Sequence, residues 1–79
     1  LPGPYDLICS RAFSSLQDFV ELTHGALAEG GVWMAMKGKI PQEEISQLPR
    51  GIEVFHVEQL EVPGLPAERC LLWLRRRVA

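Results

Sequence analysis

The chain has 79 residues, of which 47% are hydrophobic and 23% are charged, and its formal charge is −2. This length allows at most one small domain, and such a domain buries only about 60% of the surface that its unfolded chain exposes. The composition excludes a disordered chain and a membrane-spanning one, and the negative charge means that contact with nucleic acid requires a local group of basic residues.

The first expected strand is Asp6–Ser10. After its aspartate the stretch is apolar or small, which is typical of a buried parallel strand. Arg11 follows the strand directly. Open α/β folds bind their ligands at the carboxyl ends of parallel strands. Arg11 is therefore the first candidate for a functional side chain.

An amphipathic helix is expected from Ser14 onward. Ser15 and Asp18 resemble a capping box at its start. Gly30 and Gly31 are expected to end it, because a glycine adopts the left-handed conformation at little cost. Apolar or weakly polar residues recur at helical spacing on one face: Leu16, Phe19, Val20, Thr23 and Leu27.

The second expected strand, Val32–Met36, is apolar throughout and ends at Lys37. A strand, a helix and a strand with short joints predict a right-handed crossover with two parallel, largely buried strands. Arg11 and Lys37 should then lie at the same edge of the sheet. This coincidence is the strongest argument for a site that the residues alone provide.

The second half of the chain is expected to add a helix and two strands. Pro41 should begin a short helix with acidic residues in its first turn, and this helix should end near Pro49. The strand expected at Ile52–Val62 has apolar residues of both parities, so it is covered on both faces or contains a bulge. No helix separates it from the last strand, Arg69–Leu74, so the two should form an antiparallel hairpin.

Several residues have simpler structural interpretations. Cys9 and Cys70 are expected to be inert core thiols in a reduced, cytoplasmic protein, and Trp33 and Trp73 are expected to pack in the core. The basic run Arg75–Arg77 is expected to be a solvated terminus. His24 and His56 have no Cys, His or carboxylate at ligand spacing, so no metal site is predicted.

Three motifs give the chain a specific resemblance. They are YDLICSRAFSSL after the first strand, MAMKGKIPQEEI after the second, and LEVPGLPAERCLLWL in the final hairpin. In this combination the chain resembles the bacterial glucose-inhibited division protein B family. The members of this family are small-subunit ribosomal RNA guanine-N7 methyltransferases. The resemblance implies an α/β fold, β-α-β-α-β-β with a terminal antiparallel hairpin. This would be the C-terminal half of a class I, Rossmann-like methyltransferase that uses S-adenosyl-L-methionine.

The resemblance also implies site residues. Ser10, Arg11 and Ala12 correspond to the family's segment beside the cofactor and the target base. Arg11, Lys37, Gly38 and Arg69 would bind RNA, and Glu68 belongs to the same hairpin motif as Arg69. Guanine N7 carries a lone pair and no proton, so methyl transfer needs alignment and a suitable electrostatic setting but no general base. We therefore predict no catalytic acid, base or nucleophile.

The family's glycine-rich loop and its ribose-binding acidic residue have no counterpart in this sequence. We therefore expect residues 1–79 to be the C-terminal part of a methyltransferase domain that is inactive alone. One alternative is a non-enzymatic α/β interaction module that oligomerises through an open sheet edge, because an unpaired apolar strand favours such pairing. Another is a methyltransferase for a different substrate. The expected partner is small-subunit ribosomal RNA, with no membrane contact and with self-association through the exposed sheet edge.

Overall fold

The computed structural model describes residues 3–11, 15–61, 63–64 and 68–77, which form an α/β structure with a mixed four-stranded sheet. Neither α-helix in this part of the chain has the length and apolar character that a membrane span requires. The elements in chain order are β1 (Tyr5–Ser10), α1 (Leu16–Thr23), the short 3-10 helix η1 (His24–Ala26), β2 (Leu27–Lys37), α2 (Gln42–Ser46), β3 (Ile52–Leu60) and β4 (Arg69–Arg76).

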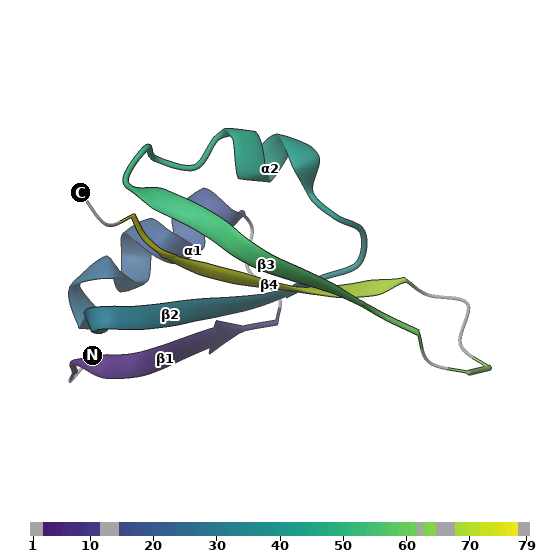
Figure 1. Cartoon of the computed structure of the whole chain (residues 1–79), viewed down its shortest axis with the longest axis horizontal. Helices are drawn as coiled ribbons and strands as arrows, with labels where there is room; N and C mark the ends of the chain where they lie inside the picture. Colours follow the sequence, from purple (N-terminus) through teal and green to yellow (C-terminus); the bar gives the residue numbers. More distant parts are fainter. Residues whose placement is uncertain (1–2, 12–14, 62, 65–67, 78–79) are drawn as a thin grey trace.

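The strands lie in the order β1-β2-β4-β3 (Figure 1). β1 and β2 are parallel, and β4 runs antiparallel to both β2 and β3. The parallel pair joined through a helix and the C-terminal antiparallel hairpin are therefore confirmed. The position of β4 between β2 and β3 was not predicted, and it makes the last strand an internal one.

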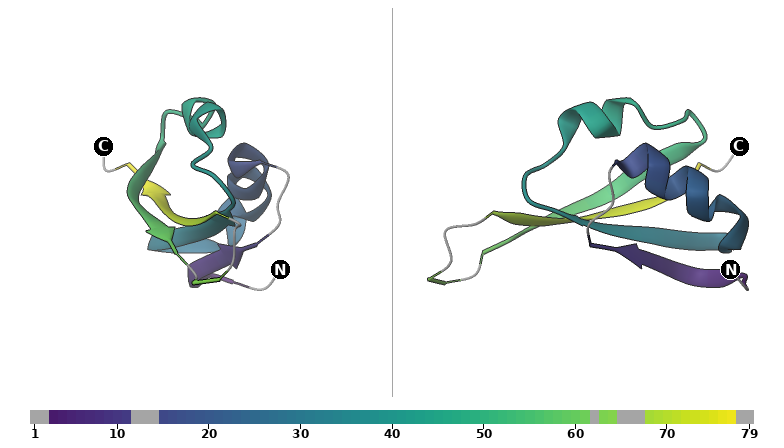
Figure 2. Two further views of the ribbon diagram at one scale, coloured as in Figure 1. Left: turned by 90° about the vertical axis from the view of Figure 1, so that its right-hand side faces the viewer. Right: turned by 180° about the vertical axis from the view of Figure 1, so that it is seen from behind.

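Both α-helices lie on the same face of the curved sheet (Figure 2). α1 contributes Leu16, Phe19 and Val20 to the core beneath it, and Ile45 of α2 packs against this core. The remaining core residues come mainly from the strands; they are Leu27, Trp33, Ala35, Ile52, Cys70, Leu72 and Leu74. Trp33 is completely buried, which confirms its expected place in the core.

α1 is shorter than the sequence predicts. Ser15 caps its start, since its Oγ accepts the N–H of Asp18 at 3.0 Å. The helix ends at Thr23, whose hydroxyl donates to the Phe19 carbonyl (2.6 Å) and accepts from Nε1 of Trp33 (2.8 Å). The Thr23 side chain thus connects the end of the helix to β2. This strand begins at Leu27, five residues before the expected start at Val32.

Gly30 and Gly31 lie inside β2, so the prediction that they end the helix was wrong. The pairing of β1 with β2 changes from Tyr5 opposite Leu27 to Leu7 opposite Val32, which is two residues along β1 but five along β2. The extra residues form an irregularity that contains Gly30, whose φ is +77°. A glycine there suits a bulge as well as a helix end, because both use a positive φ.

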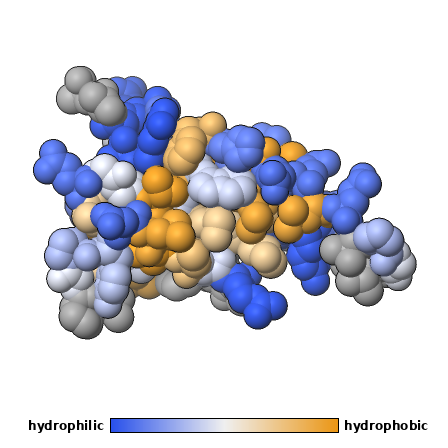
Figure 3. All heavy atoms as spheres, turned by 60° about the horizontal axis from the view of Figure 1, so that its bottom comes forward, coloured by the Kyte–Doolittle hydropathy of each residue, from blue (hydrophilic) through white to orange (hydrophobic). Residues whose placement is uncertain are grey.

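The face of the sheet opposite the helices is apolar and uncovered among the described residues (Figure 3). Leu7 of β1 is 50% exposed, and Cys9 is exposed as well. Trp73 is partly exposed on β4, where its ring lies 4.9 Å from that of His56. The expectations of a buried first strand, of a buried Cys9 and of a core Trp73 were therefore wrong. β1 is an edge strand, and helices cover only one of its faces.

The C-terminal arginines are partly exposed, as expected, but all three also bind other parts of the fold. The Arg76 guanidinium donates to the backbone carbonyls of His24 (2.9 Å), Leu27 (3.0 Å) and Ala28 (3.0 Å). It therefore connects the end of β4 to the start of β2. Arg75 and Arg77 both form ion pairs with Glu53 of β3, at 2.8 and 3.2 Å.

These contacts predict unequal effects of two neighbouring substitutions. Arg76→Met should lower the free energy of unfolding by about 1–3 kcal/mol, because three carbonyls lose a charged donor. Arg75→Met removes an exposed ion pair and should cost at most about 1 kcal/mol. Urea denaturation of both variants measures the difference. Equal losses would show that Arg76 does not hold β4 against β2.

Candidate functional site

A pocket of about 510 Å³ lies where β1 and β2 end and β4 begins. It is lined by Arg11, Met36, Lys37, Gly38 and Arg69. All four residues predicted to bind RNA are thus brought together, although Arg69 is far from the others in sequence. The antiparallel direction of β4 explains this, since the first residue of β4 lies beside the last residues of β2.

Each basic side chain of this pocket comes from the end of a strand. Arg11 directly follows β1 and is exposed. Lys37 is the last residue of β2 and pairs with Cys70 of β4. Arg69 begins β4, is exposed, and donates from Nη1 to the carbonyl of Glu68 at 3.0 Å. We refer to Arg11, Met36, Lys37, Gly38 and Arg69 as the strand-end pocket.

Lys37 is held by a carboxylate from α2. Its Nζ lies 2.8 Å from Oε1 of Glu44, and the same oxygen accepts the N–H of Leu16 at 2.9 Å. Glu44 therefore joins the end of β2 to the start of α1. The sequence suggests only that Glu44 is an acidic residue in the first turn of a helix, and no local pattern indicates its distant partners.

Cys70 is not a reactive group beside this pocket. It is completely buried opposite Lys37. Burial raises the pKa of the Cys70 thiol above its ordinary value, which keeps the thiol protonated. Its expected role as a core thiol is confirmed. Among the described residues, no group of His, Cys, Asp and Glu could hold a metal ion.

The charged lining of the strand-end pocket suits an anion. All its charged residues are basic, and within the described residues no ion pair involves Arg11 or Arg69. S-adenosyl-L-methionine is a sulfonium with a ribose and an adenine, and the pocket offers neither a carboxylate for the ribose nor an aromatic ring for the base. The residues that line the strand-end pocket therefore do not provide contacts for the ribose and the adenine of this cofactor by themselves.

The predicted cofactor segment is only partly described. Ser10 is half-buried at the end of β1, where it pairs with Ala35. Arg11 lines the strand-end pocket, and Ala12 lies outside the described residues. Contact between these residues and a methyl donor stays a prediction.

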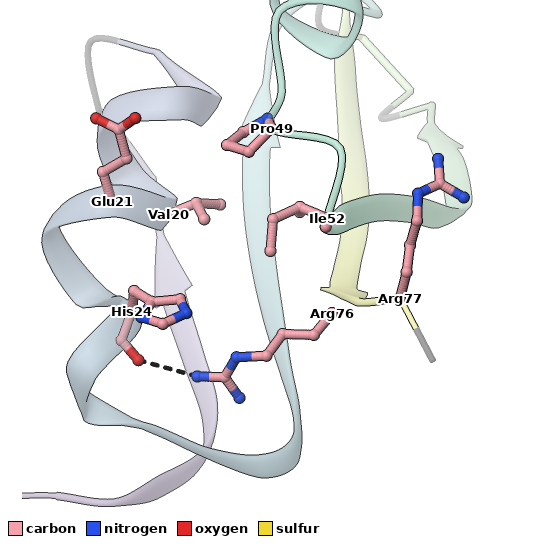
Figure 4. A pocket seen from close by; sticks show the side chains of 8 residues that line it. Val20, Glu21, His24, Pro49, Ile52, Arg76 and Arg77 are labelled. Carbon is pink, nitrogen blue, oxygen red and sulfur yellow. Dashed lines mark hydrogen bonds between the residues drawn. The ribbon is translucent and has the colours of Figure 1, made fainter. Parts of the chain in front are cut away.

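A second pocket, of about 540 Å³, lies at the opposite end of the sheet, between α1 and the start of β3 (Figure 4). Its arginines already have partners in the fold. Arg76 points toward His24 and donates to its carbonyl, as Figure 4 shows. Arg77 donates to the Arg50 carbonyl at 2.8 Å and pairs with Glu53. This pocket therefore has less free positive charge to offer a ligand than the strand-end pocket.

Comparisons with known proteins identify the family. Residues 2–72 match the model of the family described as GidB, rRNA small subunit methyltransferase G. The chain belongs to this family. The five residues that line the strand-end pocket all lie in the three motifs, and the membership agrees with the resemblance noted in the sequence.

Similar curated proteins carry the description ribosomal RNA small subunit methyltransferase G. The chain is 64% identical over 73 residues to the protein of Methylibium petroleiphilum, with 92% of this chain and 33% of that protein covered. It is 66% identical over 71 residues to the Polaromonas naphthalenivorans protein, with 90% and 32% covered. For Leptothrix cholodnii the values are 63% over 75 residues, with 95% and 34% covered. The chain spans about a third of the length of these relatives.

Gly38 provides a test of whether the strand-end pocket needs glycine for steric reasons. A Cβ at Gly38 would meet only the Glu68 carbonyl oxygen, at 3.7 Å, which is an ordinary contact. Gly38→Ala should therefore change the free energy of unfolding by less than about 0.5 kcal/mol. Gly30→Ala, at a φ of +77°, is the matched comparison and should cost about 1–2 kcal/mol. Denaturation curves for the two variants check this, and equal costs would contradict it.

Proposed function

We propose that this chain is the C-terminal part of an S-adenosyl-L-methionine-dependent methyltransferase that acts on small-subunit ribosomal RNA in the cytoplasm. Membership of the methyltransferase family supports the activity. The observation that carries the proposal for the site is the strand-end pocket. There Arg11 and Lys37 lie at the carboxyl ends of the parallel strands β1 and β2, together with Arg69 from the start of β4.

The sheet supports a Rossmann-like arrangement for the parent domain. In such folds a mostly parallel sheet has helices on both faces, and ligands lie beyond the carboxyl ends of the strands. The described sheet has its helices on one face and an apolar opposite face (Figures 2 and 3). We propose that further elements of the parent protein cover the second face and continue the sheet beyond β1.

The proposed role of the strand-end pocket is to hold RNA in position. Arg11 can donate two parallel hydrogen bonds to a phosphate or to the N7 and O6 acceptors of a guanine. Arg69 can add a second contact from the neighbouring strand. If the target atom is guanine N7, it has no proton to lose, so the residues of this chain need only align the base. Residues outside the described pocket would hold the methyl donor.

A hybrid protein tests the activity. In this hybrid, residues 1–79 of this chain replace the matching segment of the Methylibium petroleiphilum relative. Arg11→Ala in the hybrid should lower methylation of small-subunit ribosomal RNA by about 10- to 100-fold, which corresponds to the loss of one charged hydrogen-bonding group worth about 1.5–3 kcal/mol. Arg11→Lys should restore little of this, because lysine cannot bind bidentately.

The control for this experiment is Lys39→Ala. Lys39 is exposed and does not line the strand-end pocket, so its loss should leave methylation nearly unchanged. The assay follows transfer of a labelled methyl group to the RNA. Full activity of Arg11→Ala in a hybrid that is itself active would remove Arg11 from the site.

We also propose that the isolated chain associates with itself through β1. β1 is an edge strand, and its residues Tyr5 and Leu7 are 42% and 50% exposed. An exposed apolar edge strand favours pairing with a second chain. This association would be a property of the chain alone, since the proposed parent protein continues the sheet at this edge.

Sedimentation of the isolated chain measures this association. We expect a monomer–dimer equilibrium that Leu7→Lys shifts toward monomer, because a lysine on an edge strand opposes pairing. Leu22→Lys is the matched control: Leu22 is 71% exposed on α1, away from this edge. A strict monomer at all concentrations would contradict the proposal, and so would equal effects of the two substitutions.

A further inference from the structure

We infer that Glu44 is a positioning residue that holds Lys37 away from the RNA, so that Arg11 and Arg69 make the contacts with phosphate. This inference rests on the RNA-binding function proposed for the strand-end pocket. It assigns different roles to three basic residues that the sequence treats alike.

The geometry of Glu44 is the first observation. One oxygen, Oε1, accepts from both Nζ of Lys37 (2.8 Å) and the N–H of Leu16 (2.9 Å). The side chains of Lys37 and Glu44 are only 16% and 29% exposed. Solvent and salt screen a partly buried pair less than an exposed one. The pair should therefore persist under conditions that weaken surface contacts.

The hydrogen bond between Glu44 and the N–H of Leu16 stabilises the position of the Glu44 side chain. Leu16 is the first residue of α1, and the N–H groups of the first helical turn have no partner within the helix. Ser15 satisfies one of these groups, that of Asp18, and Glu44 satisfies that of Leu16. A carboxylate is also favoured at the positive end of a helix. Glu44 is thus kept in place by α1 whether or not RNA is present.

Arg11 and Arg69 differ from Lys37 because neither is paired with a carboxylate among the described residues. Both are exposed, and the hydrogen bond that the described part of the chain shows for Arg69 goes to a backbone carbonyl, which does not offset its charge. Among the residues that the structure describes, no carboxylate pairs with Arg11 or Arg69. The free positive charge of the pocket therefore belongs to these arginines, while the charge of Lys37 is offset by Glu44.

The salt dependence of RNA binding distinguishes these roles. The affinity falls as the salt concentration rises, and each phosphate contact adds about 0.7 (single strand) to 0.9 (duplex) to the magnitude of the slope of log K against log salt concentration. Below, slope means this magnitude. The experiment measures this slope for the hybrid protein with a transcript of small-subunit ribosomal RNA. Arg11→Met should lower the slope by the contribution of one phosphate contact, about 0.7–0.9; below, this amount is called one step. Lys37→Met should leave it unchanged.

Removing the charge of Glu44 should release Lys37. Glu44→Gln keeps an oxygen that can accept from Leu16, so the helix start is preserved, and the slope should rise by about one step as Lys37 gains a phosphate contact. Glu44→Gln combined with Lys37→Met should return to the original slope. A purely structural role of Glu44 would not produce this reversal.

The outcomes separate the inference from the function on which it rests. If Lys37→Met lowers the slope as much as Arg11→Met, Lys37 already contacts phosphate and the inference is wrong. This result does not depend on the folding of any Glu44 variant. If the unmodified hybrid does not bind the transcript, the proposed RNA-binding function fails, and the inference fails with it.

Discussion

The internal position of β4 is the constraint on which the rest of this structure depends. Leu72 and Leu74 of this strand are completely buried beneath the helices. At the end of β4, Arg76 donates to the backbone carbonyls of His24 in η1 and of Leu27 and Ala28 at the start of β2. Because β4 hydrogen-bonds to both β2 and β3, it connects the parallel half of the sheet to the last hairpin. Without it, β3 would have no partner in the sheet.

The same strand determines where the candidate site lies. β4 runs opposite to β2, so its first residue, Arg69, lies at the end of the sheet where Arg11 and Lys37 are found. Its last residue, Arg76, lies at the other end and supports the fold. Two arginines of one strand therefore serve different purposes because they lie at opposite ends of the sheet. Glu44 makes a similar distinction within the strand-end pocket by pairing with Lys37 but with neither arginine.

The errors of the sequence-based predictions have physical causes. Gly30 and Gly31 were expected to end the helix, but glycine serves a bulge equally well. The α-helix ends at Thr23, and the chain continues as a short 3-10 helix to Ala26. β1 was expected to be buried because its composition is apolar. Composition does not report whether a strand lies at an edge or which of its faces has a cover. The pairing of Glu44 with Lys37 and Leu16 was missed because these partners are distant in sequence.

The sequence by itself determined the order of helices and strands, the parallel pair, the final hairpin and the family, although not the end of α1 or the start of β2. These follow from residue periodicity, from short connections and from motifs, which are all properties of neighbouring residues. The tertiary structure decided the strand order, the exposure of β1 and the pairing of Glu44 with Lys37 and Leu16. It also decided that Arg76 supports the fold while Arg69 lines a pocket. These features depend on contacts between segments far apart in the chain, and local patterns do not encode such contacts.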